Sequence, residues 1–257
     1  MIILTSVLYL GIDMIRRFEE ISNNAWPALQ SIQYDGWILR FANGVTKRSN
    51  SVNLLYPSTL DAEEKIDFCE HQYLSHNIQP CFKITSMADP ADIDQRLANR
   101  GYFIHSNISF QERDISDTPC EPLGDILIET EINPHWIDDF IRMNGFDPKK
   151  KSAYIAIMQQ LCTPKCLISL VRNHQTIGVG LGVTEGAFIG LFDIVVDQAF
   201  RRTGLGYLIV ENLLRWGREK GAQTAYLQVL SDNTPAIRLY EKMGFTEKYQ
   251  YWYRMKR

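Results

Sequence analysis

Hydrophobic periodicity divides the C-terminal half of the chain into strands and amphipathic helices. Alternating or wholly apolar runs predict strands at residues 126–128, 166–171, 176–183, 187–196, 225–229 and 247–255. Apolar residues at helical spacing predict helices at residues 134–143, 152–161, 204–219 and 235–243. The run 187–196 is apolar nearly throughout, which favours a central strand buried on both faces. This order predicts an α/β fold, with a mixed but mostly antiparallel sheet flanked by helices and one β-α-β step.

The N-terminal half repeats this outline at an offset of about 143 residues, with Gly101 matching Gly244. The segment RLANRGYFI at 96–104 resembles RLYEKMGFT at 238–246, and each predicts a helix end followed by a glycine, an aromatic residue and a final strand. We therefore interpret the two halves as copies of one plan. The same patterns predict strands at 36–41, 51–55 and 82–84 and a helix at 60–74.

A connector rich in turn-forming residues separates the halves. The segment SDTPCEPLGD has two prolines, a glycine and no apolar periodicity, so it predicts domains at 1–115 and 126–257 with a linker at 116–125. The opening run MIILTSVLYL predicts either a first strand or a segment upstream of a start at Met14.

Composition narrows the classes of partner. The chain has 257 residues, and its 27 lysines and arginines against 30 acidic residues give a net charge of −3. This balance predicts no general affinity for nucleic acid or an anionic membrane, so any anion site has to be local. Five cysteines are too few for a disulfide scaffold and favour a reducing cytoplasm. No metal site is predicted, because Cys162 and Cys166 lack a second ligand pair or a close histidine.

One segment, VVDQAFRRTGLG at 195–206, joins the buried strand to the amphipathic helix. Backbone N–H groups at a helix start have no intrahelical acceptor and lie at the positive end of the helix dipole, so they bind phosphate readily. Gly204 and Gly206 would let an anion approach the backbone, and Arg201 and Arg202 add positive charge. A dinucleotide fold does not fit, because the third glycine and the later acidic residue of its fingerprint are missing.

These residues resemble the R/Q-x-x-G-x-G/A motif of the GNAT superfamily of acetyl-coenzyme A dependent N-acyltransferases. The resemblance extends to the preceding VVDQAFR, the strand YLQV at 226–229, Asn233 and the block AIRLYEKMGF at 236–245. It covers roughly residues 126–257 and implies a GNAT fold with acetyl-coenzyme A as cofactor. The N-terminal half looks like a degenerate repeat, because the acidic stretch LDAEEK at 60–65 stands where the phosphate motif would be.

The resemblance also implies roles for individual residues. Strand backbone at Ile194, Val195 and Val196 would meet the pantetheine arm and the thioester carbonyl, and Asn233 would bond the pantetheine or position the adjoining helix. The pyrophosphate would be held by the loop and the first helical residues, namely Arg201, Arg202, Thr203, Gly204, Leu205, Gly206 and Tyr207. Many members carry a glutamate on the central strand, where this chain has Gly190 or apolar neighbours. Asp193 is then our first choice for the base, with Glu185 second.

Tyr240 of the LYEKMGF block corresponds to the tyrosine that commonly protonates the departing thiolate in this superfamily. A free tyrosine has a pKa near 10 and a thiol one near 8.5, so full proton transfer would be uphill by about 2 kcal/mol. Tyr240 would therefore need a lowered pKa, or would mainly donate a hydrogen bond.

The sequence thus predicts an acetyltransferase that acts on a primary amine of a small-molecule or amino-acid-like acceptor by direct transfer in a ternary complex. The alternative is a non-catalytic sensor that binds acyl-coenzyme A through the same loop. We expect a cytoplasmic monomer or homodimer with no nucleic-acid or membrane partner.

Overall fold

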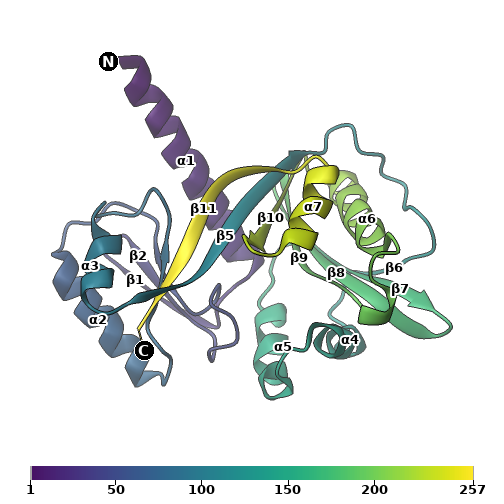
Figure 1. Cartoon of the computed structure of the whole chain (residues 1–257), viewed down its shortest axis with the longest axis horizontal. Helices are drawn as coiled ribbons and strands as arrows, with labels where there is room; N and C mark the ends of the chain where they lie inside the picture. The colour runs from purple at the N-terminus through teal and green to yellow at the C-terminus, as the bar shows by residue number, and fades with distance from the viewer. Residues whose placement is uncertain (1, 257) are drawn as a thin grey trace. The chain divides into compact units, whose positions relative to one another are not determined.

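The computed structural model describes residues 2–256, with side chains described from Gly11 onward, and the chain forms two compact units (Figure 1). The N-terminal unit comprises Met1–Ser109 and Tyr249–Arg257, and the C-terminal unit comprises Phe110–Lys248. Elements of the first half of the chain are α1 (Ile2–Ala25), β1 (Gln30–Tyr34), β2 (Trp37–Phe41), β3 (Val52–Leu54), α2 (Ala62–Ser75), β4 (Cys81–Ile84), α3 (Ile93–Asn99) and β5 (Phe103–Asp114). Those of the second half are β6 (Leu127–Glu129), α4 (Pro134–Asn144), α5 (Lys151–Gln159), β7 (Lys165–Arg172), β8 (Gln175–Glu185), β9 (Phe188–Val196), α6 (Leu205–Glu219), β10 (Thr224–Leu230), α7 (Thr234–Lys242) and β11 (Thr246–Met255), with short 3₁₀ helices at Pro148–Lys150 and Gln198–Phe200.

The N-terminal unit has strand order β1-β2-β3-β4-β11-β5, so it contains the last strand of the chain. β11 runs antiparallel to β4, and Trp252 lies opposite Ile84. Arg254 on β11 donates two hydrogen bonds to the carboxylate of Asp94 on α3, at 2.8 and 2.7 Å. The observed unit boundaries therefore differ from the division at 1–115 and 126–257, because the final strand packs with the first half of the chain.

The C-terminal unit has the order β5-β10-β9-β8-β7-β6. Strands β6 to β9 pair antiparallel, and β9 pairs parallel with β10 across the connecting helix α6. The end of β5, from the first half of the chain, lies next to β10. β5 and β11 are each divided between the two units, with residues 103–109 and 249–255 in the N-terminal unit and residues 110–114 and 246–248 in the C-terminal unit. The order of elements along the chain could not reveal this division.

Three glycines at alternate positions of β8 bring α6 close to the sheet. A side chain at Gly180 would lie 2.5 Å from the Ile209 side chain, and one at Gly182 would lie 3.1 Å from Leu213. Ile209 and Leu213 are fully buried in the main core of this unit. The glycine stripe thus lets the helix pack directly on the strand backbone and positions its first turn beside the end of β9.

The α/β prediction is confirmed, and every strand and helix expected in the C-terminal half is present within a few residues of its predicted bounds. Two elements of the N-terminal half were missed, α1 and β1. The first-strand alternative for the opening run is wrong, because the backbone from Ile2 is helical. The linker 116–125 has no regular structure and is tied to α6, where the Asn212 side chain bonds both backbone groups of Leu123.

Candidate functional site

The central feature of the C-terminal unit is the point where β9 and β10 separate. Their parallel pairing runs from Phe188 opposite Thr224 to Leu191 opposite Leu227 and ends there. β9 nevertheless continues to Val196, and its other edge stays paired with β8 as far as Val196 opposite Gly178. The backbone of β9 beyond Leu191 therefore presents one edge that β10 does not cover, and this edge includes the predicted residues Ile194, Val195 and Val196.

A bulge in β9 lies at the start of this uncovered edge. The register shifts between Val179 and Leu181 of β8, so that Asp193 and Ile194 together stand opposite Gly180. Asp193 has φ = +50°, a left-handed conformation that is uncommon for a residue with a side chain. The bulge bends the strand and directs the Asp193 carboxylate away from the position that regular pairing would give it.

The carboxylate of Asp193 is held by a residue that sequence reasoning missed. The hydroxyl of Tyr154, on α5, donates a hydrogen bond of 2.5 Å to Asp193 Oδ2. Tyr154 is 1% exposed and stacks on Phe140 of α4. It stands 39 residues before Asp193, on the apolar side of a helix, so its spacing gave no signal of this contact.

The loop before α6 has the backbone that an anion site requires. Arg202 and Gly204 both have left-handed φ, at +64° and +86°, and such loops turn successive N–H groups toward one side. Gly204 caps α6 and has no side chain to bond the N–H groups of the first helical turn, and no other described side chain is hydrogen-bonded to them. Arg201, Arg202, Thr203 and Gly204 are all exposed. Arg201 Nε donates to the carbonyl oxygen of Val196 at 3.1 Å, which joins the loop to the end of β9.

The other predicted loop residues have more specific surroundings. A side chain at Gly206 would lie 3.2 Å from Leu239 of α7, so this glycine serves helix packing as well as backbone access. Tyr207 is exposed, and Leu205 packs partly against the core. Asn233 Oδ1 accepts the backbone N–H of Ala236 at 3.4 Å and so caps α7. Of the two roles expected for Asn233, the structure shows the positioning of the helix.

Tyr240 is largely buried on α7 and packs edge-on against Phe245, with ring centroids 5.8 Å apart. Burial raises the pKa of its hydroxyl to about 12. Within residues 2–256, no side chain or backbone group hydrogen-bonds this hydroxyl. The expected alternative of a lowered pKa is therefore wrong, and hydrogen-bond donation is the role that the environment of Tyr240 favours.

The absence of a glutamate at position 190 has a steric cause. A Cβ atom at Gly190 would lie 2.6 Å from the hydroxyl oxygen of Tyr226, the residue opposite it on β10. The Tyr226 ring thus fills the space above Gly190. The second candidate base, Glu185, pairs with Phe188 at the beginning of β9, roughly 23 Å of strand from Val195 at about 3.3 Å per residue. This distance leaves Asp193 as the carboxylate of β9 nearest the uncovered edge.

Comparisons with known proteins show which family this chain is similar to. Residues 132–245 match the model of the "Acetyltransferase (GNAT) family", and residues 13–141 match the model described as "Probable histone acetyltransferase Rv0428c C-terminal". The uncharacterized N-acetyltransferase YobR of Bacillus subtilis is 30% identical over 253 residues, which cover 95% of this chain and 100% of that protein. The [ribosomal protein bS18]-alanine N-acetyltransferase of Salmonella typhimurium is 44% identical over 57 residues, which cover 22% of this chain and 38% of that enzyme.

Solved structures show the same fold across both units. A GCN5-related N-acetyltransferase from Kribbella flavida matches with a TM-score of 0.66 at 13% identity, covering 93% of this chain and 95% of that one. A tandem GNAT protein from the clavulanic acid biosynthesis pathway matches with a TM-score of 0.64 at 12% identity, covering 92% and 86% of the two chains. Among residues 2–256, no helix combines the length and the apolar content that a membrane span requires.

Proposed function

This chain belongs to the GNAT family of acetyltransferases, and on that premise we propose that its C-terminal unit transfers an acetyl group from acetyl-coenzyme A to a primary amine. The chain is an acyltransferase by family, and the assignment of the donor, the acceptor and the residues is the proposal. The observation that carries it is the uncovered edge of β9 next to the uncapped first turn of α6.

The residues present fit the donor at two points. The uncovered edge of β9 offers backbone N–H and C=O groups at strand spacing, which suit the amide groups of an extended pantetheine arm. The first turn of α6 offers N–H groups and a positive dipole end, with Arg201 and Arg202 exposed beside it, which suit a pyrophosphate. Acetyl-coenzyme A would supply the activated acetyl group, bound as a thioester.

The proposed base is Asp193. An alkyl ammonium group with pKa near 10.4 must lose one proton before its nitrogen can attack, which costs about 4.6 kcal/mol at pH 7. We assign the acceptance of this proton to the Asp193 carboxylate, which lies in the bulge where the uncovered edge begins. Backbone N–H groups of Ile194 to Val196 would stabilise the negative charge that builds on the carbonyl oxygen during attack.

The proposed partner of the leaving sulfur is Tyr240. The nitrogen loses a second proton as the amide bond forms and the carbon–sulfur bond breaks, and this proton ends on the sulfur. With a pKa raised to about 12, the Tyr240 hydroxyl stays protonated and donates a hydrogen bond to the sulfur as negative charge develops there. The first proton leaves Asp193 for solvent, so one turnover yields an amide, a free thiol and one proton.

We propose a small molecule with an amino-acid-like amine as the acceptor. The named activity of the bacterial relative, which acetylates an alanine of a ribosomal protein, supports an α-amine as the reacting group. We place the enzyme in the cytoplasm, where its five free cysteines would stay reduced.

Release of free thiol from acetyl-coenzyme A, measured with a panel of amino acids and small amines, tests this function. We expect saturable turnover with at least one α-amine, and mass spectrometry should find one acetyl group added to that amine. Tight coenzyme binding without turnover on any amine would contradict the proposal and would favour the sensor alternative.

A further inference from the structure

Tyr154 makes a contact that the family resemblance does not assign. Its hydroxyl donates to Asp193 Oδ2 at 2.5 Å, within the range of hydrogen bonds from a hydroxyl to a carboxylate. The ring is held on two sides, by Phe140 at 5.3 Å in a stacked arrangement and by Phe146 at 5.6 Å edge-on. A side chain packed in this way has little rotational freedom, so the direction of its hydroxyl is fixed by α4 and α5 rather than by β9.

Asp193 needs such a support because of its backbone. Its φ of +50° places it in a bulge, where β-sheet pairing does not fix the side chain as it does in a regular strand. The left-handed conformation is uncommon for residues with a side chain, and aspartate is one of the types that adopt it most readily. The bond from Tyr154 supplies a constraint at the carboxylate itself.

We propose that Tyr154 is the positioning residue for the base, holding the Asp193 carboxylate at the uncovered edge of β9 in the orientation that accepts a proton from the amine. This inference rests on the proposed function and extends it to a residue of α5. On α4, the buried donor Trp136 Nε1 bonds a neutral backbone oxygen, the carbonyl of Ile168, at 3.0 Å. Tyr154 instead directs its hydroxyl to a carboxylate at the one bulge of β9.

The ionisable groups on the neighbouring elements have partners of their own. On α4, Arg142 pairs with Asp139 and Asp197, and Asp138 pairs with Lys151 of α5. On α6, Arg215 pairs with Glu211. The titratable groups of the flanking strands are Glu185 on β8, at the far end of β9, and Tyr226 on β10, which lies over Gly190.

The test is Tyr154→Phe, which removes the hydroxyl and keeps the ring. We expect kcat to fall about 10-fold with an unchanged KM for acetyl-coenzyme A, because the carboxylate loses its orientation while the donor site is untouched. A hydrogen bond to a carboxylate favours its charged form, so its loss should move the acid limb of the kcat profile about one unit to higher pH. A purely structural role would lower the melting temperature without moving this limb.

Tyr102→Phe is the matched control. Tyr102 is also a buried tyrosine whose hydroxyl donates to a carboxylate, Glu70, at 3.1 Å, but it lies in the N-terminal unit. Its loss should leave kcat and the acid limb at their wild-type values. Circular dichroism and thermal unfolding of both variants establish that they are folded at the assay temperature.

Asp193→Asn separates this inference from the function on which it rests. The asparagine still accepts the bond from Tyr154, so the variant should fold, and we expect kcat to fall at least 100-fold. Adding Tyr154→Phe to that variant should cause no further loss, because there is no longer a base to position. Two results would overturn the role of Tyr154 and leave acetyl transfer standing. One is a Tyr154→Phe variant whose kcat and acid limb equal those of the wild type. The other is a fall in kcat on adding Tyr154→Phe to Asp193→Asn that equals its fall in the wild-type background. Full activity of Asp193→Asn would show that Asp193 is not the base and that Tyr154 therefore does not position one.

Discussion

The first turns of α2 and α6 stand at matching places in the two halves of the chain and differ in what satisfies their backbone. At α2, the Asp61 carboxylate accepts the N–H groups of Glu63 and Glu64, at 2.9 and 3.2 Å. At α6, the corresponding position is Gly204, and no side chain bonds the first-turn N–H groups. A helix start that is already capped by a carboxylate has neither the free donors nor the positive potential that a phosphate needs.

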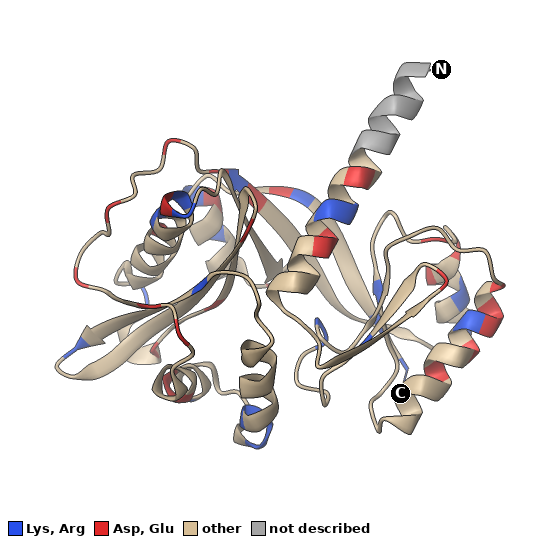
Figure 2. Ribbon diagram, turned by 180° about the vertical axis from the view of Figure 1, so that it is seen from behind, with Lys and Arg blue, Asp and Glu red and all other residues tan. Residues whose placement is uncertain are grey.

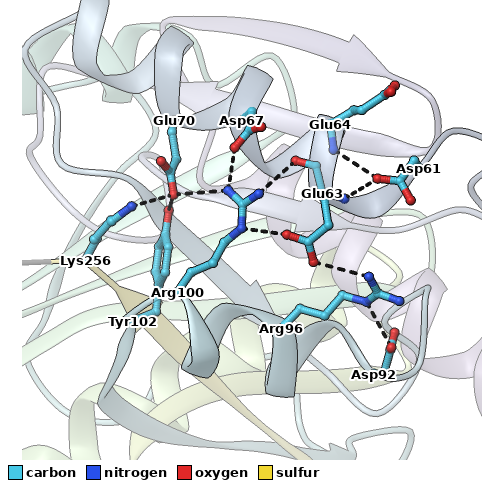
Figure 3. A network of polar contacts seen from close by, with 10 residues as sticks. All are labelled: Asp61, Glu63, Glu64, Asp67, Glu70, Asp92, Arg96, Arg100, Tyr102 and Lys256. Carbon is cyan, nitrogen blue, oxygen red and sulfur yellow. Dashed lines mark hydrogen bonds and ion pairs between the residues drawn. The ribbon is translucent and has the colours of Figure 1, made fainter.

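The charged side chains near the two helices also differ in their partners. Acidic residues lie along α2 in Figure 2, and Figure 3 shows that Glu63 is bonded by Arg96 and Arg100 of the α3 region, at 3.2 and 2.7 Å. Within residues 2–256, Arg201 and Arg202 near α6 form no ion pair. Arg96 and Arg100 therefore join α2 to the α3 region, whereas Arg201 and Arg202 form no ion pair among the described residues.

The strands next to these helices show the same contrast. β3 ends at Leu54, one residue beyond its pairing with β4, whereas β9 continues from Leu191 to Val196 without pairing to β10. At the position of Tyr240, the N-terminal half has Leu97, which is fully buried in the core of its unit. The comparison teaches that the two units differ in a helix cap, a strand extension and a single hydroxyl, which are the features on which the proposed donor site depends.

The largest effect should come from disturbing the loop before α6. Gly204→Val forces a β-branched residue into φ = +86°, which should shift the backbone that leads into the first-turn N–H groups, so we expect the dissociation constant of coenzyme A to rise at least 100-fold in calorimetry. Gly101→Val imposes the same strain at φ = +85° in the N-terminal unit and should leave the affinity unchanged. If both variants bind coenzyme A with equal affinity, the proposal that only the C-terminal unit binds it is wrong.

The next largest effect should come from removing the Tyr240 hydroxyl, which the corresponding residue of the N-terminal half, Leu97, lacks. Tyr240→Phe should lower kcat about 100-fold without changing coenzyme A affinity, because the hydrogen bond to the sulfur forms as charge develops there. Since burial raises the pKa of Tyr240 to about 12, the wild-type kcat should show no fall from its ionisation below about pH 10. A basic limb near pH 8 that disappears in Tyr240→Phe would contradict this assignment.

A smaller effect is expected from the arginines. Combining Arg201→Ala and Arg202→Ala should raise the dissociation constant of coenzyme A about 10-fold and weaken its dependence on salt, because two charge-assisted contacts with phosphate are lost. In the N-terminal unit, Arg96→Ala with Arg100→Ala should instead lower the free energy of unfolding and leave the affinity unchanged. Affinity that depends equally on both pairs would show that the N-terminal unit also binds the donor.

The smallest effect concerns how β11 joins the N-terminal unit. Side-chain hydrogen bonds, chiefly from Arg254 and to a smaller extent from Trp252, hold the pKa of Asp94 below its ordinary value. This stabilisation is present above the ordinary pKa near 3.9 and is lost as pH falls through the lowered value. Asp94→Asn should therefore cost about 1 kcal/mol of unfolding free energy at pH 7, and less below about pH 4, in urea titrations.

Asp92→Asn is the control for this pair. It removes a carboxylate that bonds Arg96 at 2.9 Å one helical turn away, within the α3 region itself. We expect a much smaller loss of unfolding free energy than for Asp94→Asn, because the pair is local and exposed. If Asp92→Asn lowers the free energy of unfolding as much as Asp94→Asn does, the hydrogen bonds between Asp94 and β11 contribute no more to stability than a local, exposed pair.

Much of the site could be predicted from sequence because its parts are local. Gly204 with Arg201 and Arg202 lies between a wholly apolar run and an amphipathic helix, and this order alone places N–H groups, glycine backbone and positive charge together. Tyr240 was placed by a motif of adjacent residues. By contrast, α1 was missed because its apolar opening run fits a strand as well as a helix over a short window.

The amino-acid sequence by itself determined the order of strands and helices, and the loop of glycines and arginines before α6 with its acidic counterpart in the first half, since each depends on residues close together in the chain. The tertiary structure decided three other matters: the division of β5 and β11 between the units, the packing of the Tyr226 ring over Gly190, and the hydrogen bond from Tyr154 to Asp193. Each joins residues far apart in the sequence. Their contact depends on how the sheet and the helices pack, and no local pattern of apolar and polar residues records it.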